Sequence, residues 1–154
     1  RVIADNPDHN ILFGPVSITR EYQALSKDLM VQFLKNNNYK PEIAAKIKPR
    51  HPMRRAHLKP AERAALKESL RNIDDVSALI AEIERDGKGV PTLLRHYLKL
   101  NGQLLSFNID PDFSQCLDGL IMVDFTHTNN KLIRQYMGAD RWDCFAAYHG
   151  LEDK

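Results

Sequence analysis

The chain has 154 residues, 43% of them apolar and 27% charged, and its 22 Lys and Arg residues against 20 Asp and Glu residues give a formal charge of +2. This composition is typical of a folded globular domain and excludes collagen-like, low-complexity and disordered chains. The longest apolar run, 119–123, has the length of a strand and is far shorter than the ~20 residues of a membrane-spanning helix. The near-zero net charge argues against nucleic acid as a partner.

The first segment with a clear pattern is an apolar strand at 10–18. Nearly every residue in it is apolar, which is typical of a strand buried on both faces. Pro15 cannot donate a hydrogen bond to a neighbouring strand, so the strand must bulge or lie at an opening of the sheet there. Apolar residues then recur at helical spacing from Tyr22 to Phe33, with Thr19 as the expected N-cap.

The rest of the chain alternates helices with two further strands. Capping residues, prolines and glycines predict helices that start at Pro41 and span 61–70, 76–83, 91–100, 131–137 and 140–149. Strands are expected at 103–109 and 120–125, joined by a long polar connection over 110–118. The order predicts a helix-rich α/β (α+β) chain, one domain over 1–154, whose three strands form only a small, incomplete sheet.

A basic stretch at 46–59 holds six Lys or Arg residues and no acidic residue. It could bind an acidic carrier protein, a phosphopantetheine phosphate or an anionic membrane surface, or it could be a solvated loop between helices. It has no aromatic side chain for base stacking, which again disfavours nucleic acid. The expected partner-binding residues are Arg50, Arg54, Arg55 and Lys59.

Carboxylates at the strand ends are the best candidates for chemistry. Asp110, Asp112, Asp118 and Asp124 could each bind an amine or act as a general base, although Asp110 and Asp112 also suit an Asx turn. The six histidines have no metal-ligand spacing, His127 stands alone, and Cys116 and Cys144 are expected to be free thiols without a histidine partner. We therefore expect neither a metal site nor a covalent nucleophile.

Two longer stretches resemble a known family. One is ILFGPVSI at 11–18, followed by a helix; the other is GVPTLLRHYLKLNG at 89–102, which runs into FNIDPDF at 107–113 and LDGLIMVD at 117–124. Together they resemble the C-terminal part of bacterial proteins named hemolysins, which belong to the GNAT-fold N-acyltransferases. The ornithine-lipid N-acyltransferases are related to that family, and the acyl-homoserine lactone synthases share its fold.

The resemblance implies a place for each strand. Strand 10–18 would be the fifth of the GNAT sheet, beside the gap that admits the acyl-pantetheine arm, and 103–109 and 120–125 would be the last two strands. Residues 40–86 would form a helical insertion. The first four strands and the pyrophosphate-binding loop would lie before Arg1, which is not a Met. The chain would then be the C-terminal half of an acyltransferase and inactive by itself.

The implied activity is transfer of a long acyl chain from acyl carrier protein or acyl-CoA to an amine in lipid synthesis, by direct attack and with no permanently bound cofactor. The expected substrate-binding residues are Ser17, Phe107, Asn108, Asp110 and Asp112. The implied partners are acyl carrier protein and an upstream acyltransferase domain. The implied location is the cytoplasm, with contact to a membrane surface as a further expectation. Two alternatives are a non-catalytic module that docks through the basic stretch and an acyl-homoserine lactone synthase.

Overall fold

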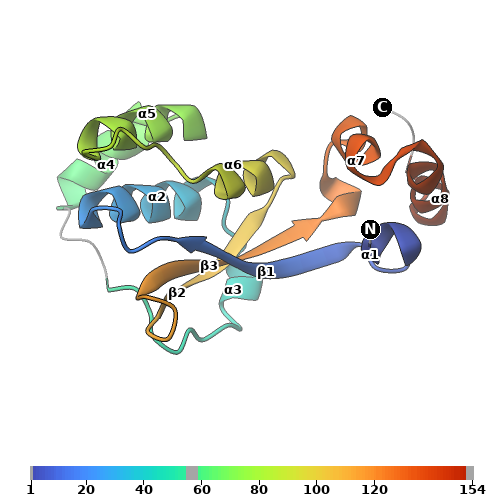
Figure 1. Ribbon diagram of the computed structural model, residues 1–154, viewed down its shortest axis with the longest axis horizontal. Helices are drawn as coiled ribbons and strands as arrows, with labels where there is room; N and C mark the ends of the chain where they lie inside the picture. The colour runs from blue at the N-terminus through green and yellow to red at the C-terminus, as the bar shows by residue number, and fades with distance from the viewer. Residues whose placement is uncertain (1, 55–58, 152–154) are drawn as a thin grey trace.

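The computed structural model describes residues 2–54 and 59–151 and has one three-stranded sheet surrounded by helices (Figure 1). The strands are β1 (Ile11–Ile18), β2 (Gln103–Asp110) and β3 (Cys116–Asp124), all antiparallel, in the order β1-β3-β2. Figure 1 shows α2, α4, α5 and α6 on one side of the sheet and α3 on the other. The mixed, helix-rich architecture with a small sheet is therefore confirmed.

Apart from α1, which the sequence analysis did not predict, the helices fall within a few residues of their predicted ranges. They are α1 (Val2–Asp5), α2 (Ala24–Asn37), α3 (Pro41–Ala44), α4 (Pro60–Ser69), α5 (Ile73–Ile83), α6 (Thr92–Lys99), α7 (Asn130–Met137) and α8 (Ala139–His149), with a 3-10 turn η1 (Phe125–His127) after β3. Asn72 caps α5, because its side chain accepts hydrogen bonds from the backbone N–H groups of Asp74 and Asp75. α5 ends before Gly87: Glu84 is its C-cap in an extended conformation, and Gly87, with a positive φ of 69°, closes the turn that follows.

The main core lies between the sheet and the helices above it. Residues alternate between the two faces of each strand, so one face of the sheet carries the apolar set that these helices cover. The buried members from the three strands are Val16, Ile18, Leu104, Phe107, Leu117 and Ile121, and those from α2, α5 and α6 include Met30, Leu34, Val76, Ile80 and Leu94. The segment 40–86 thus supplies core side chains through α5.

β1 is an edge strand, and the expectation that it is buried on both faces is wrong. Only Val16 and Ile18 are buried, whereas Ile11, Leu12 and Phe13 are 46%, 46% and 69% exposed. The physical reason is the strand order: β1 has β3 on one side only, and among the described residues no strand pairs with its other edge. Its apolar character therefore reflects a surface that this chain leaves open.

Pro15 fits this edge without a bulge. The β1–β3 register runs unbroken from Ile11 opposite Asp124 to Ile18 opposite Leu117. The N–H of Phe125 donates to the carbonyl of Asn10, so hydrogen-bonded pairs alternate from that point and include Gly14 and Val16 but not Pro15. The missing N–H of Pro15 therefore falls on the free edge, which is the opening that the sequence predicted as one of two possibilities.

The start of α2 differs from its prediction. The helix begins at Ala24, Gln23 occupies the N-cap position, and Thr19 lies outside it. Contacts with the α5–α6 connection explain the shift: the Tyr22 hydroxyl donates to the carbonyl of Gly89, and the Gln23 N–H donates to the Glu84 carboxylate. β3 is longer than predicted, because it starts at Cys116. The connection from β2 is therefore only 111–115, and Ser114 and Gln115 adopt positive φ there.

A second, smaller core lies at one end of the sheet, where α1, α7 and α8 meet (Figure 1). Ile3, Ile133, Trp142, Phe145 and Ala146 are buried there.

At the edge of the sheet formed by β2, the chain after α2 covers the strand. Leu104 exchanges backbone hydrogen bonds with Asn38 and Lys40, and the Ile109 N–H donates to the carbonyl of His51. The outer edge of β2 is thus partly satisfied, whereas that of β1 is not.

Candidate functional site

The face of the sheet that α2, α5 and α6 do not cover carries a row of polar side chains. Antiparallel register places Ser17 of β1 and Asn108 of β2 on either side of Asp118 of β3. The Ser17 hydroxyl donates to Asp118 Oδ1 at 2.6 Å, and the side-chain oxygen Oδ1 of Asn108 accepts from the His51 N–H at 2.7 Å. Two of the predicted site residues therefore share one row, while Asn108 also ties the 40–54 segment to the sheet.

Asp110 and Asp112 lie at the end of this row in the turn between β2 and β3. Asp110 Oδ1 accepts from the N–H groups of Asp112 and Phe113, so this carboxylate forms the Asx turn that the sequence offered as the alternative to a ligand site. The Asp112 side chain is exposed. Phe107 points the other way: it is buried in the main core, with the Lys35 ammonium 5.6 Å from its ring centre.

Cys116, at the start of β3, is a poor nucleophile. Burial raises the pKa of its thiol, and the neighbouring Asp118 carboxylate, which lies 3.3 Å from the sulfur, raises it further. A thiol held in the protonated form lacks the thiolate that nucleophilic attack requires.

Of the predicted partner-binding residues, Arg50, Arg54 and Lys59 are exposed. Arg55 lies outside the described residues. Lys59 immediately precedes Pro60, the first residue of α4, and its N–H donates to Glu62. The described cations of the basic stretch are therefore on the surface, in the segment that joins α3 to α4.

The other end of the polar face holds a cluster that the sequence analysis did not find. His127, which forms no recognisable metal-ligand spacing in the sequence, has its Nδ1 3.0 Å from Asp124 Oδ2. Asp124 Oδ1 accepts three further hydrogen bonds, from Asn10 Nδ2, the Thr126 N–H and the Thr126 hydroxyl. The spacing Asp-x-Thr-His was a signal, because an Asp that ends a strand commonly captures donors two and three residues later.

This cluster opens onto a polar hollow. The hollow is lined from α3 and the residue before it, from the turn that precedes β2, and from β3 and η1; its lining includes Lys40, Glu42, Gln103, Asp124 and His127. The Asp124 side chain is 19% exposed and that of His127 is 75% exposed. The imidazole can therefore meet a ligand, while the carboxylate behind it is largely shielded.

Asp124 is held in its ionised form. Burial by itself would raise its pKa, but the hydrogen bonds from the Thr126 hydroxyl and N–H and from His127 outweigh this effect and lower the pKa of Asp124 below its ordinary value. An ionised Asp124 accepts from every neighbour and orients the imidazole of His127.

Replacing Thr126 with Val is expected to lower the free energy of unfolding at neutral pH by about 1–2 kcal/mol, because it removes a hydrogen bond to a charged group. A group whose folded-state pKa is lowered stabilises the fold above its unfolded pKa of about 3.9 and ceases to do so as the pH falls through the folded value. The difference between variant and wild type should therefore shrink below about pH 4. Urea unfolding at both pH values measures it, with Thr19→Val as an exposed control, and an unchanged difference at acid pH would contradict the assignment.

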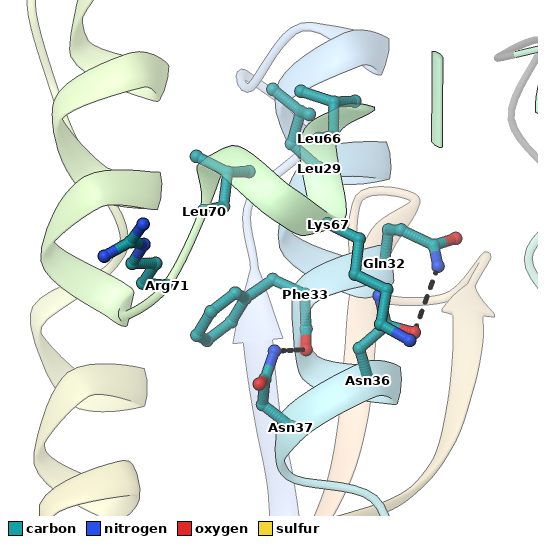
Figure 2. Close-up of a pocket in the computed structure, with 9 residues that line it drawn as sticks. All are labelled: Leu29, Gln32, Phe33, Asn36, Asn37, Leu66, Lys67, Leu70 and Arg71. Atoms are coloured by element: carbon teal, nitrogen blue, oxygen red, sulfur yellow. Dashed lines mark hydrogen bonds between the residues drawn. The ribbon is translucent and has the colours of Figure 1, made fainter. Parts of the chain in front are cut away.

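A separate apolar pocket lies between α2 and α4 (Figure 2). Leu29, Phe33, Leu66 and Leu70 provide its apolar lining, and Lys67 and Arg71 are its cationic residues. Figure 2 shows the amide side chains of α2 engaged with their own helix: Gln32 binds Asn36, and Asn37 donates to the Phe33 carbonyl. This pocket can hold apolar matter, but it contains no group suited to proton transfer.

No protein-family model, curated protein or solved structure matches this chain. Within residues 2–54 and 59–151, no helix is both long and apolar enough to cross a bilayer. The same residues contain no group of three His, Cys, Asp or Glu side chains placed to hold a metal ion. Any functional assignment must therefore start from the sheet itself, its polar face and the free edge of β1.

Proposed function

We propose that this chain is the C-terminal segment of a GNAT-like N-acyltransferase that moves a long acyl chain from acyl carrier protein or acyl-CoA to an amine in lipid synthesis. The observation that carries the proposal is the free edge of β1. The resemblance implies one more strand there. Among the described residues this edge has no partner strand, and its side chains are apolar and exposed.

The exposed side chains of β1 support this reading. Ile11 and Phe13 lie on the polar face of the sheet and Leu12 on the helix-covered face, so apolar groups flank the free edge on both sides. Natural edge strands usually carry charges, prolines, bulges or short lengths that prevent pairing; β1 has Pro15, but over its eight residues it has no charged side chain and no bulge. A further strand would cover these side chains and satisfy the outward backbone groups.

Pro15 gives that edge a defined gap. The outward N–H groups of Phe13 and Ser17 can bind a neighbouring strand, but Pro15 between them has none. A neighbouring strand would therefore lack one backbone hydrogen bond opposite Pro15. We assign this gap to the pantetheine arm of the donor. Direct attack by the amine on the thioester needs no enzyme nucleophile, which suits the protonated thiol of Cys116.

The donor protein would dock on the basic surface. Acyl carrier proteins are acidic, and Arg50, Arg54 and Lys59 are exposed cations near the outer edge of β2. Such contacts mainly accelerate association and weaken with salt, so activity with acyl carrier protein should fall more steeply with ionic strength than activity with acyl-CoA.

We expect the intact protein that carries these residues to release thiol from long-chain acyl-CoA or acyl carrier protein when an amine-bearing lipid precursor is present. Mass spectrometry should find the N-acylated product. Residues 1–154 alone should be inactive, because the edge of β1 is unpaired in them. S-adenosylmethionine as acceptor tests the lactone-synthase alternative. Carrier-protein binding without thiol release by the intact protein would favour the non-catalytic module and reject the proposal.

A further inference from the structure

We propose that His127, oriented by Asp124, accepts a proton from the acceptor amine in the hollow on the polar face. This inference rests on the proposed function and adds to it the base and the acceptor site. It is carried by the hydrogen bonds around His127 and by the position of the hollow beside β3, next to the start of β2.

The contacts of His127 assign its tautomer. Nδ1 lies 3.0 Å from Asp124 Oδ2 and 3.1 Å from the Thr126 hydroxyl oxygen. The hydroxyl of Thr126 donates its single proton to Asp124 Oδ1 at 2.6 Å, so its oxygen can only accept a hydrogen bond from His127. The ionised carboxylate of Asp124 has no proton and can likewise only accept. Nδ1 must therefore carry the hydrogen, and Nε2 is left with the lone pair of a base.

The backbone that carries His127 is fixed at several points. The Asn101 amide donates to the carbonyl of His127, and the buried Thr128 hydroxyl contacts the carbonyls of Leu100 and Asp124. Asn101 itself adopts a positive φ of 59° in the turn between α6 and β2. These hydrogen bonds join this turn to η1 and fix the backbone that carries the imidazole. A side chain that transfers a proton needs such a fixed position.

Charged groups from the facing elements suit an ammonium ligand. Glu42 of α3 offers a negative charge across the hollow, Lys40 before α3 a positive one, and Asp124 of β3 stands behind His127. Tyr39 is the other titratable group in the lining. An ammonium group can lie between Glu42 and His127 with the rest of the acceptor toward solvent.

The hollow also lies within reach of the proposed donor gap. Met122 lines it, and Leu120, two residues along β3 on the same face, is opposite Pro15. At ~3.3 Å per strand residue, the four residues from Leu120 to Asp124 span about 13 Å along β3, and β1 lies a further ~4.8 Å to the side of β3. A thioester that enters past Pro15 must therefore cross β1 and run along the polar face to meet an amine held at His127.

The reaction then balances. One proton of the ammonium passes to His127 Nε2, the amine nitrogen forms a bond to the thioester carbonyl carbon, and the C–S bond breaks. The second proton lost from nitrogen neutralises the thiolate that leaves. His127 returns its proton to solvent, and no oxidant, reductant or covalent enzyme intermediate is needed.

Ring-nitrogen NMR of residues 1–154 tests the geometry without any activity. We expect the Nδ1–H tautomer for His127 in the wild type at alkaline pH. In Asp124→Asn, the donors around Oδ1 hold the amide oxygen there and turn its NH₂ group toward Nδ1, which should switch His127 to the Nε2–H form. An Nε2–H tautomer in the wild type would overturn the inference.

The kinetic test uses the intact protein with acyl-CoA and an amine acceptor. His127→Ala should lower kcat/KM at pH 7 by about 10²–10⁴-fold, and the loss should shrink toward pH 10, where the free amine forms in solution. His96→Ala, an exposed histidine of α6, is the control and should leave activity unchanged. If the wild type is active and His127→Ala is equally active, or loses the same activity at every pH, His127 is not the base, while the proposed acyltransferase function stands. Inactive wild type would reject the acyltransferase proposal and, with it, this role.

Discussion

Leu104→Ala is expected to lower the free energy of unfolding by about 2–5 kcal/mol, the cost of a cavity left by a fully buried leucine. Leu104 has no exposed surface, and its side chain packs in the main core, where a methyl group lies 2.9 Å from the position that a Cβ on Gly119 would take. Its backbone also binds Asn38 and Lys40, so the residue joins β2 to the chain that follows α2.

Urea unfolding of residues 1–154 measures this loss. Leu93→Ala is the matched control, because Leu93 of α6 is 58% exposed and its truncation should change stability by less than about 0.5 kcal/mol. Equal effects of the two substitutions would show that the sheet and its covering helices do not form the described core.

Phe13→Lys is expected to act differently on the isolated chain and on the intact protein. In residues 1–154 the side chain is exposed, so the substitution should change stability by less than about 0.5 kcal/mol. If a further strand covers β1 in the intact protein, the same lysine becomes an unpaired buried charge, which costs about 3–5 kcal/mol. Acyl transfer should be lost with it.

Parallel unfolding of the two protein forms provides the measurement. Tyr136→Lys on α7, where the tyrosine is 62% exposed, should be harmless in both forms. A Phe13→Lys variant that is equally tolerated in the intact protein would mean that the edge of β1 stays free, and the main support for the proposed function would be lost.

The contrast between helix ends shows what local sequence can predict. Asn72 and Pro60 act through neighbours within three or four residues; both ends of α4 and the C-terminal end of α5 were predicted to within one residue, and α5 starts three residues before its predicted range. The start of α2 was not, because Tyr22 and Gln23 find their partners at Gly89 and Glu84, more than 60 residues away. A capping residue such as Thr19 competes poorly when the preceding chain is tied down by such contacts.

The candidate site divides in the same way. Ser17 and Asp110 were named from residue type and strand position and Asn108 by resemblance, and Ser17 and Asn108 lie on one face because strand residues alternate. Phe107 was placed with them by resemblance, yet it faces the core. The pair Asp124 and His127 needed the turn η1, whose hydrogen bonds bring an exposed imidazole onto a shielded carboxylate.

The amino-acid sequence by itself determined the order and type of the main elements, because apolar periodicity, proline, glycine and capping side chains act over a few residues. Only the tertiary structure decided that β3 lies between β1 and β2, that β1 is left with a free apolar edge, and that His127 meets Asp124. These features depend on which strands pair and on turns pinned by distant groups, and such pairings follow from the packing of the whole sheet.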